Sequence, residues 1–294
     1  MIHLQLTAQS FFENRQPPRF GLIDRSHGLG SLSISAIQQD KYGFLWFGSQ
    51  GGLYRFDGRK IQSFTHNPYN ANSIPNDLIQ TLYYDQSDNA LWIGTYGGLA
   101  CLEIDSGHFT HYKKKRKPVG AHHQTTGLSN NIIIAISQDR VGNIWVGTME
   151  GLNRISIKGK QIDLIPTVHP TIRSLHLDSS GRLWIGSYGG LQYWDQRSHQ
   201  AVKANIQLPS TNVMSITEPE PGRLLLGLWG SGIAEFWPDL DRIRAISLPD
   251  KRIYAVMESQ DGTIWAGSWG GGLWARPKKG DPVLFNSTQN SELS

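Results

Sequence analysis

The 294-residue sequence contains a single cysteine, Cys101, which excludes an internal disulfide and any cysteine-rich metal site. No apolar run is long enough for a transmembrane helix. Residues 1–9 lack the basic stretch followed by an apolar block that is typical of a secretion signal. Only 18% of the residues are charged, with a net charge of +4, whereas 38% are hydrophobic. This balance is typical of a globular chain and excludes a disordered one.

Motifs of catalysis and metal binding are also absent from the sequence. The ten His residues show no H-E-x-x-H or other metal-ligand spacing. No G-x-S-x-G elbow joins a strand to a helix. The pair His122 and His123 falls in a basic insert, where we expect both side chains to be exposed. We therefore expect no cofactor and no bound metal.

The sequence is rich in glycine, with 32 residues, and it contains an internal repeat. A motif of one hydrophobic residue, Trp, any residue and Gly occurs five times, at 45–48, 91–94, 144–147, 183–186 and 264–267. A sixth copy, at 224–227, has Leu225 in place of the Trp. Successive copies are 46, 53, 39, 41 and 40 residues apart. Periods of this length are typical of propellers, solenoids and arrays.

Each copy of the repeat predicts four strands. Apolar residues alternate with period two at 34–37 and 253–256, which predicts a first strand. A hairpin turn follows, as at Asp40 and Gly43, because Asp bonds the backbone two residues on and Gly accepts a positive φ. The Trp motif is the second strand, and a third and a less regular fourth strand complete the unit. Four antiparallel strands in about 40 residues make one propeller blade, so the prediction is an all-β propeller.

The repeat predicts six complete blades in a single domain spanning 1–294. The expected blades are 32–66, 76–112, 130–166, 171–208, 212–248 and 252–285. Residues 19–24 resemble the outer strand of a closing blade, and 286–294 resemble the link before the second blade. We therefore expect a chain cut from a longer protein inside a seventh blade. A six-bladed ring that closes on itself is the alternative.

The pattern A-I-x-x-D-x-x-G-x-L-W-x-G-[ST] at 36–49, which continues to Gly58, resembles the two-component regulator propeller repeat. Residues 135–154 follow it closely, and the resemblance covers 20–285. It implies the periplasmic sensor part of a membrane-bound bacterial signalling protein, often one that senses carbohydrate. An Ig-like linker, a transmembrane helix and a cytoplasmic histidine kinase or diguanylate cyclase usually follow in this family. The missing Trp at 225 and the basic insert at 113–117 depart from the pattern.

The repeated Trp residues are candidates for a ring that stacks on a ligand. Burial between adjacent blades is the favoured interpretation, because every blade needs the same large apolar filler. The turn Asp residues also repeat too regularly to be an acid/base pair, and we assign them to turns. The Trp residues with a structural role are Trp46, Trp92, Trp145, Trp184 and Trp265.

Positions that vary within the constant frame are the better candidates for ligand binding. They lie on the turns between second and third strands and on the links that enter first strands. In a propeller both rise on one face, around the mouth of the central channel. Aromatic rings with Arg and Asn groups around a concavity suit a sugar or another small polar ligand; alternatively, the rings only cover glycine-rich turns. The candidates are Gln50, Tyr96, Asn131, Glu150, Arg173, Tyr188, Asn212, Trp229, Arg252 and Trp269.

These observations predict a non-catalytic sensor module whose partner is a small polar ligand, such as a carbohydrate, or a second propeller or linker domain of the same protein. A homodimer of the full-length protein is a further expectation. The alternatives are a propeller enzyme of the lyase or glycosidase type, acting on a carbohydrate or lactone, and a pure protein-interaction scaffold. No aromatic residues are interleaved with the basic run at 113–117, so we do not expect nucleic acid to be a partner. Membrane association is expected only through downstream segments.

Overall fold

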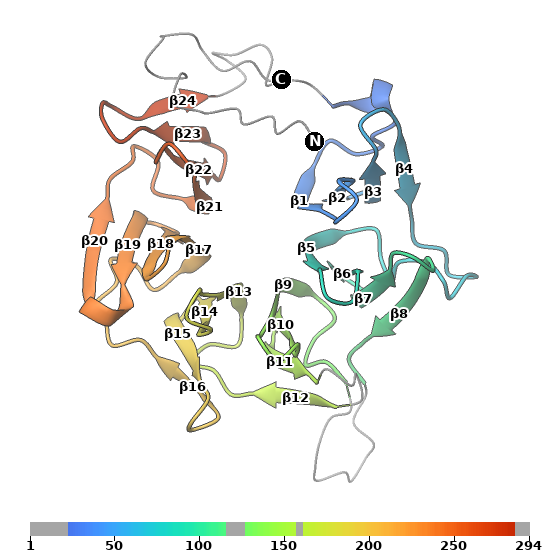
Figure 1. Cartoon of the computed structure of the whole chain (residues 1–294), viewed down its shortest axis with the longest axis horizontal. Helices are drawn as coiled ribbons and strands as arrows, with labels where there is room; N and C mark the ends of the chain where they lie inside the picture. The colour runs from blue at the N-terminus through green and yellow to red at the C-terminus, as the bar shows by residue number, and fades with distance from the viewer. Residues whose placement is uncertain (1–22, 116–126, 157–160, 286–294) are drawn as a thin grey trace. The chain divides into compact units, whose positions relative to one another are not determined.

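The computed structural model describes residues 23–115, 127–156 and 161–285, which form 24 strands and two short 3-10 helices (Figure 1). The strands make six four-stranded antiparallel sheets, and in each sheet the spatial order follows the chain. The predicted all-β propeller with six blades is therefore confirmed. The outer strand expected at 19–24 and the seventh blade expected from 286 fall almost entirely outside the described residues, so both stay predictions.

The described chain divides into two compact units. Residues Ile23–Leu177 and Gly181–Lys203 form a four-blade unit, and Asp178–Ser180 with 204–285 form a two-blade unit. The helices are η1 (Arg25–His27), before blade one, and η2 (Pro238–Leu240), in blade five.

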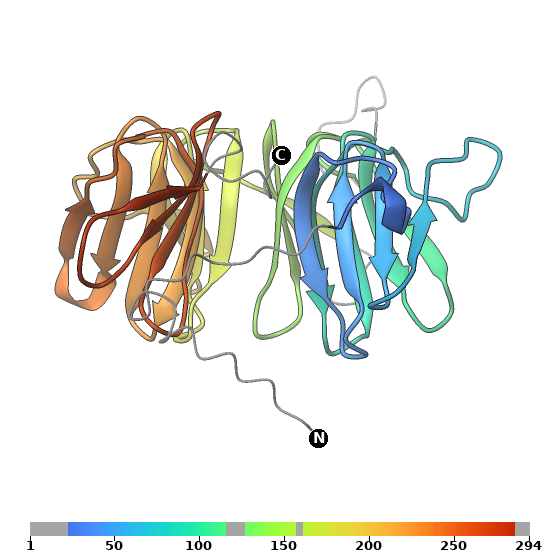
Figure 2. The same cartoon turned by 90° about the horizontal axis from the view of Figure 1, so that it is seen from above.

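In the four-blade unit, blade one is β1 (Ile34–Gln39), β2 (Leu45–Ser49), β3 (Gly52–Phe56) and β4 (Ile61–Phe64), whose strands lie side by side in blue in Figure 2. Blade two is β5 (Ile79–Asp85), β6 (Ala90–Thr95), β7 (Gly98–Glu103) and β8 (His108–Tyr112). Blade three is β9 (Ile133–Gln138), β10 (Ile144–Thr148), β11 (Gly151–Ile155) and β12 (Ile162–Ile165). Blade four is β13 (Ile172–Leu177), β14 (Leu183–Ser187), β15 (Gly190–Asp195) and β16 (Gln200–Lys203).

In the two-blade unit, blade five is β17 (Val213–Glu220), β18 (Arg223–Leu228), β19 (Gly232–Trp237) and β20 (Arg242–Ile246). Blade six is β21 (Ile253–Glu258), β22 (Ile264–Ser268), β23 (Gly272–Arg276) and β24 (Val283–Phe285).

In the four-blade unit, the motif side chains Trp46, Trp92 and Trp145 each pack in an apolar cluster with residues of the next blade. Trp46 is 1% exposed and belongs to one apolar cluster with Leu102 of blade two. Trp145 packs on Trp194 of blade four, with ring centroids 4.9 Å apart. Trp92 and Trp184 are also buried, whereas Trp265 of blade six is half-buried and stacks on Phe285. Burial of one such indole contributes about 2–3 kcal/mol of apolar transfer energy, and Trp46, Trp92 and Trp145 thereby tie one blade to the next.

A buried carboxylate holds the Trp and the hairpin turn together in blade one. Asp40 Oδ1 accepts hydrogen bonds from the backbone N–H groups of Tyr42 and Phe44, at 2.9 and 3.1 Å. Its Oδ2 accepts the indole N–H of Trp46 at 2.8 Å. Asp139 makes the same bond to Trp145 in blade three, at 2.9 Å. The sequence indicated the turn role of Asp, but not its bond to the indole.

The Gly of the motif allows the next blade to approach closely. A Cβ on Gly48 would lie 2.6 Å from Cγ2 of Ile79, the first residue of blade two, and one on Gly147 would lie 2.6 Å from Cγ2 of Ile172 in blade four. Any side chain at these positions would therefore push adjacent blades apart. Gly267, in blade six, has only Ala255 Cβ nearby, at 4.0 Å.

The substitution Gly147→Ala tests this constraint. We expect it to lower the free energy of unfolding by about 1–3 kcal/mol, because overpacking a close contact forces side chains off their rotamers. Gly267→Ala is the matched control in the same motif position, and we expect a change within about 0.5 kcal/mol. Urea titration followed by Trp fluorescence measures both, and equal losses would contradict a role of the Gly in blade packing.

The substitution Asp40→Ala tests the bond between the turn and the indole. We expect a loss of about 2–4 kcal/mol, because a buried indole N–H and two backbone donors lose a charged acceptor. Asp57 is the control, since it accepts backbone N–H groups of Arg59 and Lys60 in an exposed turn but no indole. Asp57→Ala should cost less than about 1 kcal/mol in the same denaturation assay. A similar loss in the two variants would show that the indole bond adds nothing.

Candidate functional site

A backbone hydrogen bond joins the variable turn of a blade to the variable link that enters its first strand. The residue that follows the second strand donates its N–H to a carbonyl of that link. The pairs are Gln50 to Ser33, Tyr96 to Leu78, Met149 to Ile132, Trp229 to Asn212 and Trp269 to Arg252, at 3.0–3.3 Å. Turn and link candidates of one blade therefore lie side by side. A single channel mouth shared by all of them stays a prediction.

In the two-blade unit the candidates gather around three rings, Trp229, Tyr254 and Trp269, which we call the aromatic cluster. The ring centroids of Trp229 and Trp269 are 6.2 Å apart, and those of Tyr254 and Trp269 are 5.8 Å apart. Trp269 is 60% exposed and Tyr254 39% exposed. The cluster thus presents large apolar faces to solvent at the edge of two neighbouring blades.

A charged pair lies beside the aromatic cluster. The guanidinium of Arg252 contacts the carboxylate of Asp250, with Nη2 to Oδ2 at 3.2 Å and Nε to Oδ1 at 3.3 Å. The backbone N–H of Arg252 also donates to Asp250 Oδ1, at 2.8 Å. This backbone bond, followed by the bond from the guanidinium, holds the pKa of Asp250 below its usual range. Gly271 leaves room for this carboxylate, since a Cβ there would lie 2.0 Å from Asp250 Oδ2.

The aromatic cluster and this pair offer complementary chemistry. Ring faces bury the apolar face of a ligand, while Arg252 donates and Asp250 accepts hydrogen bonds from polar groups at its edge. The link residue Asn212 is held next to Trp229 by the backbone bond described above. The structure thus brings together four of the predicted candidates: Asn212, Trp229, Arg252 and Trp269.

In the four-blade unit, two candidates pair in blade four. The guanidinium of Arg173 lies over the ring of Tyr188, 5.8 Å from its centroid. His169 meets the same ring edge-on at 5.6 Å. Tyr188 is thereby enclosed on two sides, although it is still 38% exposed.

Two other candidates of this unit anchor the start of the basic insert. Glu150 forms an ion pair with Lys114, at 2.8 Å, and Asn131 Oδ1 accepts the backbone N–H of Lys114 at 2.7 Å. The hydrogen bond from Lys114 lowers the pKa of Glu150. Gln50 and Tyr96 make no side-chain hydrogen bond or ring contact within the described ranges. His122, His123 and the remainder of the insert lie outside those ranges.

Sequence analysis missed two residues of the site, Asp250 and Tyr254. Tyr254 is the second residue of β21, and Arg173 occupies the same place in β13. Each packs on the turn aromatic of its own blade, Trp269 or Tyr188. The variability of this strand position from blade to blade was the available signal.

Three further properties bear on chemistry. In the described part of the chain, no group of three or more His, Cys, Asp or Glu side chains is placed to hold a metal ion. Burial raises the pKa of the Cys101 thiol to about 12, so this thiol stays protonated near neutral pH. No helix among the described residues is both long and apolar enough to cross a bilayer.

Comparison with known proteins gives relatives by sequence and by fold. A histidine kinase, P4, of Formosa agariphila is 26% identical over 65% of this chain, and the match spans 14% of the kinase. The extracellular domain of a putative hybrid two-component system from B. thetaiotaomicron superposes with a TM-score of 0.53 at 20% identity, covering 86% of this chain and 41% of that domain. An inactive virginiamycin B lyase from Staphylococcus aureus superposes with a TM-score of 0.65 at 15% identity, covering 85% of this chain and 83% of the lyase. At these identities the two solved structures share the fold alone.

The family comparison adds four matches. Segments 28–51, 127–150, 168–189 and 247–270 match the family described as two-component regulator propeller. They fall in blades one, three, four and six, where each spans the first two strands and the link that enters them. The resemblance seen in the sequence is confirmed: four of the six blades contain a segment that matches the two-component regulator propeller family.

Proposed function

We propose that this chain is the extracytoplasmic, ligand-sensing propeller of a bacterial transmembrane signalling protein with a histidine kinase or diguanylate cyclase as its output. The repeats of four blades and the sequence similarity to a histidine kinase support this proposal. The match spans only 14% of that kinase, so the output activity would reside in other parts of the full-length protein.

The observation that carries the sensing role is the aromatic cluster beside Arg252 and Asp250. Trp269 leaves 60% of its surface in water, although burying an indole is favourable. Rings that remain exposed next to a paired Arg and Asp suit a ligand with apolar faces and a polar rim. A sugar or oligosaccharide has this chemistry.

The cluster also suggests how binding would be transmitted. Trp229 belongs to blade five and Trp269 to blade six, and the N–H of Gly230 bonds the carbonyl of Lys251 on the link between these blades, at 2.8 Å. A ligand that contacts both Trp rings would favour the arrangement in which blades five and six are packed together. Such a ligand shifts the population toward that arrangement.

A thermal-shift screen with neutral oligosaccharides and amino acids tests the proposal. A ligand at about 100 times its Kd stabilises the fold by about 2.7 kcal/mol, which raises the melting temperature measurably. Trp269→Ala should abolish this rise, because it removes the central ring of the cluster. The melting temperature of the ligand-free variant should change little, since most of this side chain is already exposed.

Tyr69→Ala is the matched control, since Tyr69 is an aromatic residue that is 97% exposed on the link between β4 and β5. It should leave the ligand-induced rise unchanged. A large loss of melting temperature in ligand-free Trp269→Ala would show that the ring is a packing residue. Absence of any stabilising ligand would favour the scaffold alternative, and turnover of an oligosaccharide or lactone would favour an enzyme.

A further inference from the structure

One register position distinguishes blade six from the other blades. The residue of the third strand that pairs with the start of the motif is large and apolar in four blades, where it is Phe56, Leu102, Ile155 or Phe236. In blade six the residue opposite Ile264 is Arg276. A charged side chain thus stands where the repeat places an apolar one.

The partner of this position changes as well. Leu102 shares an apolar cluster with Trp46 of the preceding blade, and Ile155 shares one with Trp92. Arg276 follows blade five, in which Leu225 replaces the Trp. Between blades five and six the contact of an indole with an apolar residue is therefore missing, because Leu225 replaces the indole in blade five and Arg276 replaces the apolar residue in blade six.

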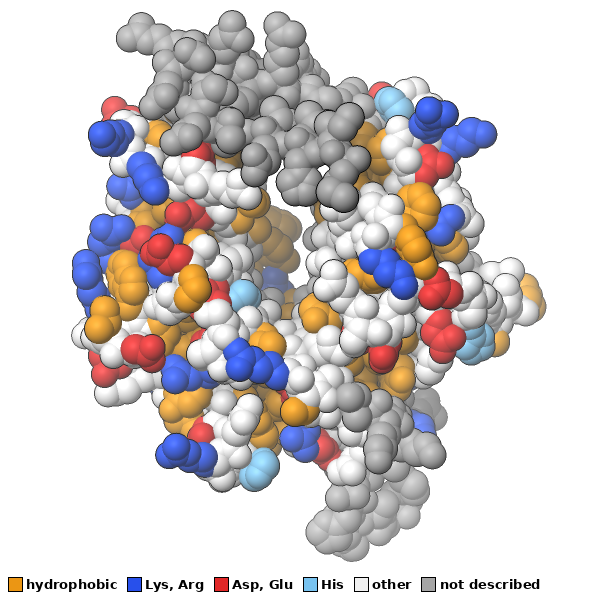
Figure 3. All heavy atoms as spheres, in the orientation of Figure 1, with side chains coloured by type: hydrophobic (Ala, Val, Ile, Leu, Met, Phe, Trp, Pro, Cys, Tyr) orange, Lys and Arg blue, Asp and Glu red, His pale blue; other side chains and the backbone are white. Residues whose placement is uncertain are grey.

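A cavity of about 460 Å³ lies between these two blades. Four cationic and three acidic side chains line it: Arg223, Arg244, Arg276, Lys278, Glu220, Glu235 and Glu258. Figure 3 shows blue and red side chains close together over β19 and β20. Local departures from an otherwise consistent pattern are expected at functional sites.

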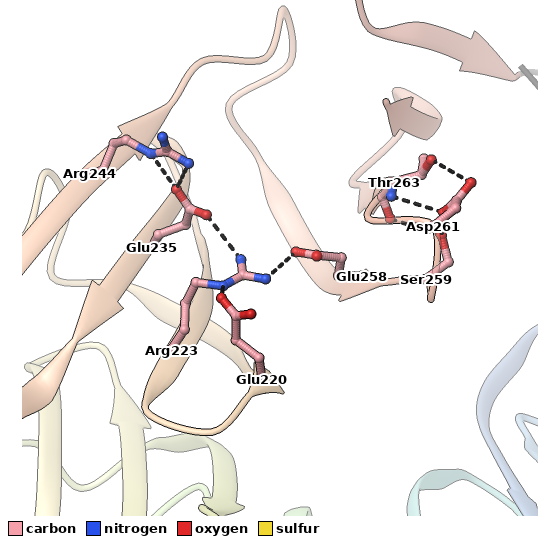
Figure 4. A network of polar contacts seen from close by, with 8 residues as sticks. All are labelled: Glu220, Arg223, Glu235, Arg244, Glu258, Ser259, Asp261 and Thr263. Atoms are coloured by element: carbon pink, nitrogen blue, oxygen red, sulfur yellow. Dashed lines mark hydrogen bonds and ion pairs between the residues drawn. The ribbon is translucent and has the colours of Figure 1, made fainter. Parts of the chain in front are cut away.

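The acidic side chains of the cavity already have partners, as Figure 4 shows. Arg223, which is 8% exposed, contacts Glu220, Glu235 and Glu258 at 2.6, 3.0 and 2.8 Å. Arg244 also pairs with Glu235. Burial alone would lower the pKa of Arg223, but the hydrogen bonds to Glu258 and Glu220 raise it. The guanidinium therefore stays charged, and it engages the carboxylates of the cavity.

Two cations of the same cavity lack an acidic partner. Arg276 is half-buried and Lys278 is exposed, and neither forms a side-chain hydrogen bond or ion pair with another residue of the described chain. The stem of Lys278 lies across the turn at Gly262, where a Cβ would be 1.9 Å from its Cε. The carboxylates of the cavity are engaged by Arg223 and Arg244, so a ligand that brings its own anionic group would gain a direct ion pair with the half-buried Arg276.

We propose that the cavity between blades five and six binds a small organic anion whose carboxylate or phosphate group is held by Arg276 and Lys278. The planar guanidinium donates two parallel hydrogen bonds to either group, and the ammonium adds a point charge. This site is separate from the aromatic cluster and does not depend on the proposed sensing role.

The crevice between blades two and three shows that the repeat alone does not create such a site. It has a volume of about 350 Å³ and retains Trp92 and Ile155 at the positions of Leu225 and Arg276. Its charged lining side chains are Asp85, Asp88 and Glu103, with no Arg or Lys among the described lining residues. The anion site is thus specific to the altered pair of blades.

Isothermal titration with citrate and with inorganic phosphate, at ionic strength matched with NaCl, tests the proposal and separates the two anion classes. We expect one of them to bind, with Arg276→Gln weakening the affinity about tenfold or more and Lys278→Gln about threefold or more. Lys279→Gln removes the same charge next to the cavity but outside its lining, and it should change the affinity less than about twofold. Circular dichroism should show an unchanged fold for all three variants.

Two outcomes would overturn the site: no binding of either probe below about 10 mM, or equal weakening by Lys279→Gln and Arg276→Gln, which would indicate only general charge attraction. Trp269→Ala should leave the affinity for citrate or phosphate unchanged. Failure of the oligosaccharide screen therefore says nothing against this site, and failure of the anion titration says nothing against the aromatic cluster.

Discussion

The packing of a buried motif Trp against the neighbouring blade underlies the architecture of the blades, and in blades one and three a hairpin Asp anchors the indole by a hydrogen bond. In blade one this bond joins the turn after β1, the second strand and the interface with blade two through Asp40 and Trp46. Blade two lacks this bond. Asp85 Oδ2 instead accepts a hydrogen bond from Nε2 of Gln138 in blade three, at 2.7 Å, and the buried indole N–H of Trp92 has no partner in the described chain. The interface keeps its apolar contact in either case, so packing of the Trp is the constant element.

The motif Gly of blades one, two and three permits a close approach of the Ile that begins the next blade, which makes these interfaces tight and alike. Interiors packed to this density tolerate little variation, which explains why most blades resemble one another. Blade five departs from the repeat in two paired positions: Leu225 replaces the Trp, and Glu235 is the third-strand residue opposite it. In blades one and three that position is Arg55 or Arg154, lying over the Trp ring. A buried ion network centred on Arg223 takes the place of the aromatic contact, and a charged cavity accompanies it.

The two proposed binding sites both use blades five and six but different parts of them. The aromatic cluster lies on the turns after β18 and β22 and at the start of β21, whereas the cavity proposed to bind an anion is lined mainly by the strands and by residues just beyond β23. Binding at either site would contact both blades at once. The packing of these two blades is therefore the element through which a ligand would act on the rest of the protein.

The sequence by itself determined the class of fold, the six four-stranded blades of the described chain and the residues of the turns. The reason is that strand alternation, the Asp and Gly of the turns and the spacing of the motif are local properties repeated six times. Repetition also separated constant positions, such as Trp46, from variable ones, such as Trp269. Only the tertiary structure decided which variable residues meet: Trp229 with Trp269, Tyr254 with Trp269, and Glu150 with Lys114 of an insert. The role proposed for Arg276 likewise rests on strand register and on the preceding blade, because contacts between blades join residues about 40 positions apart that no local pattern relates.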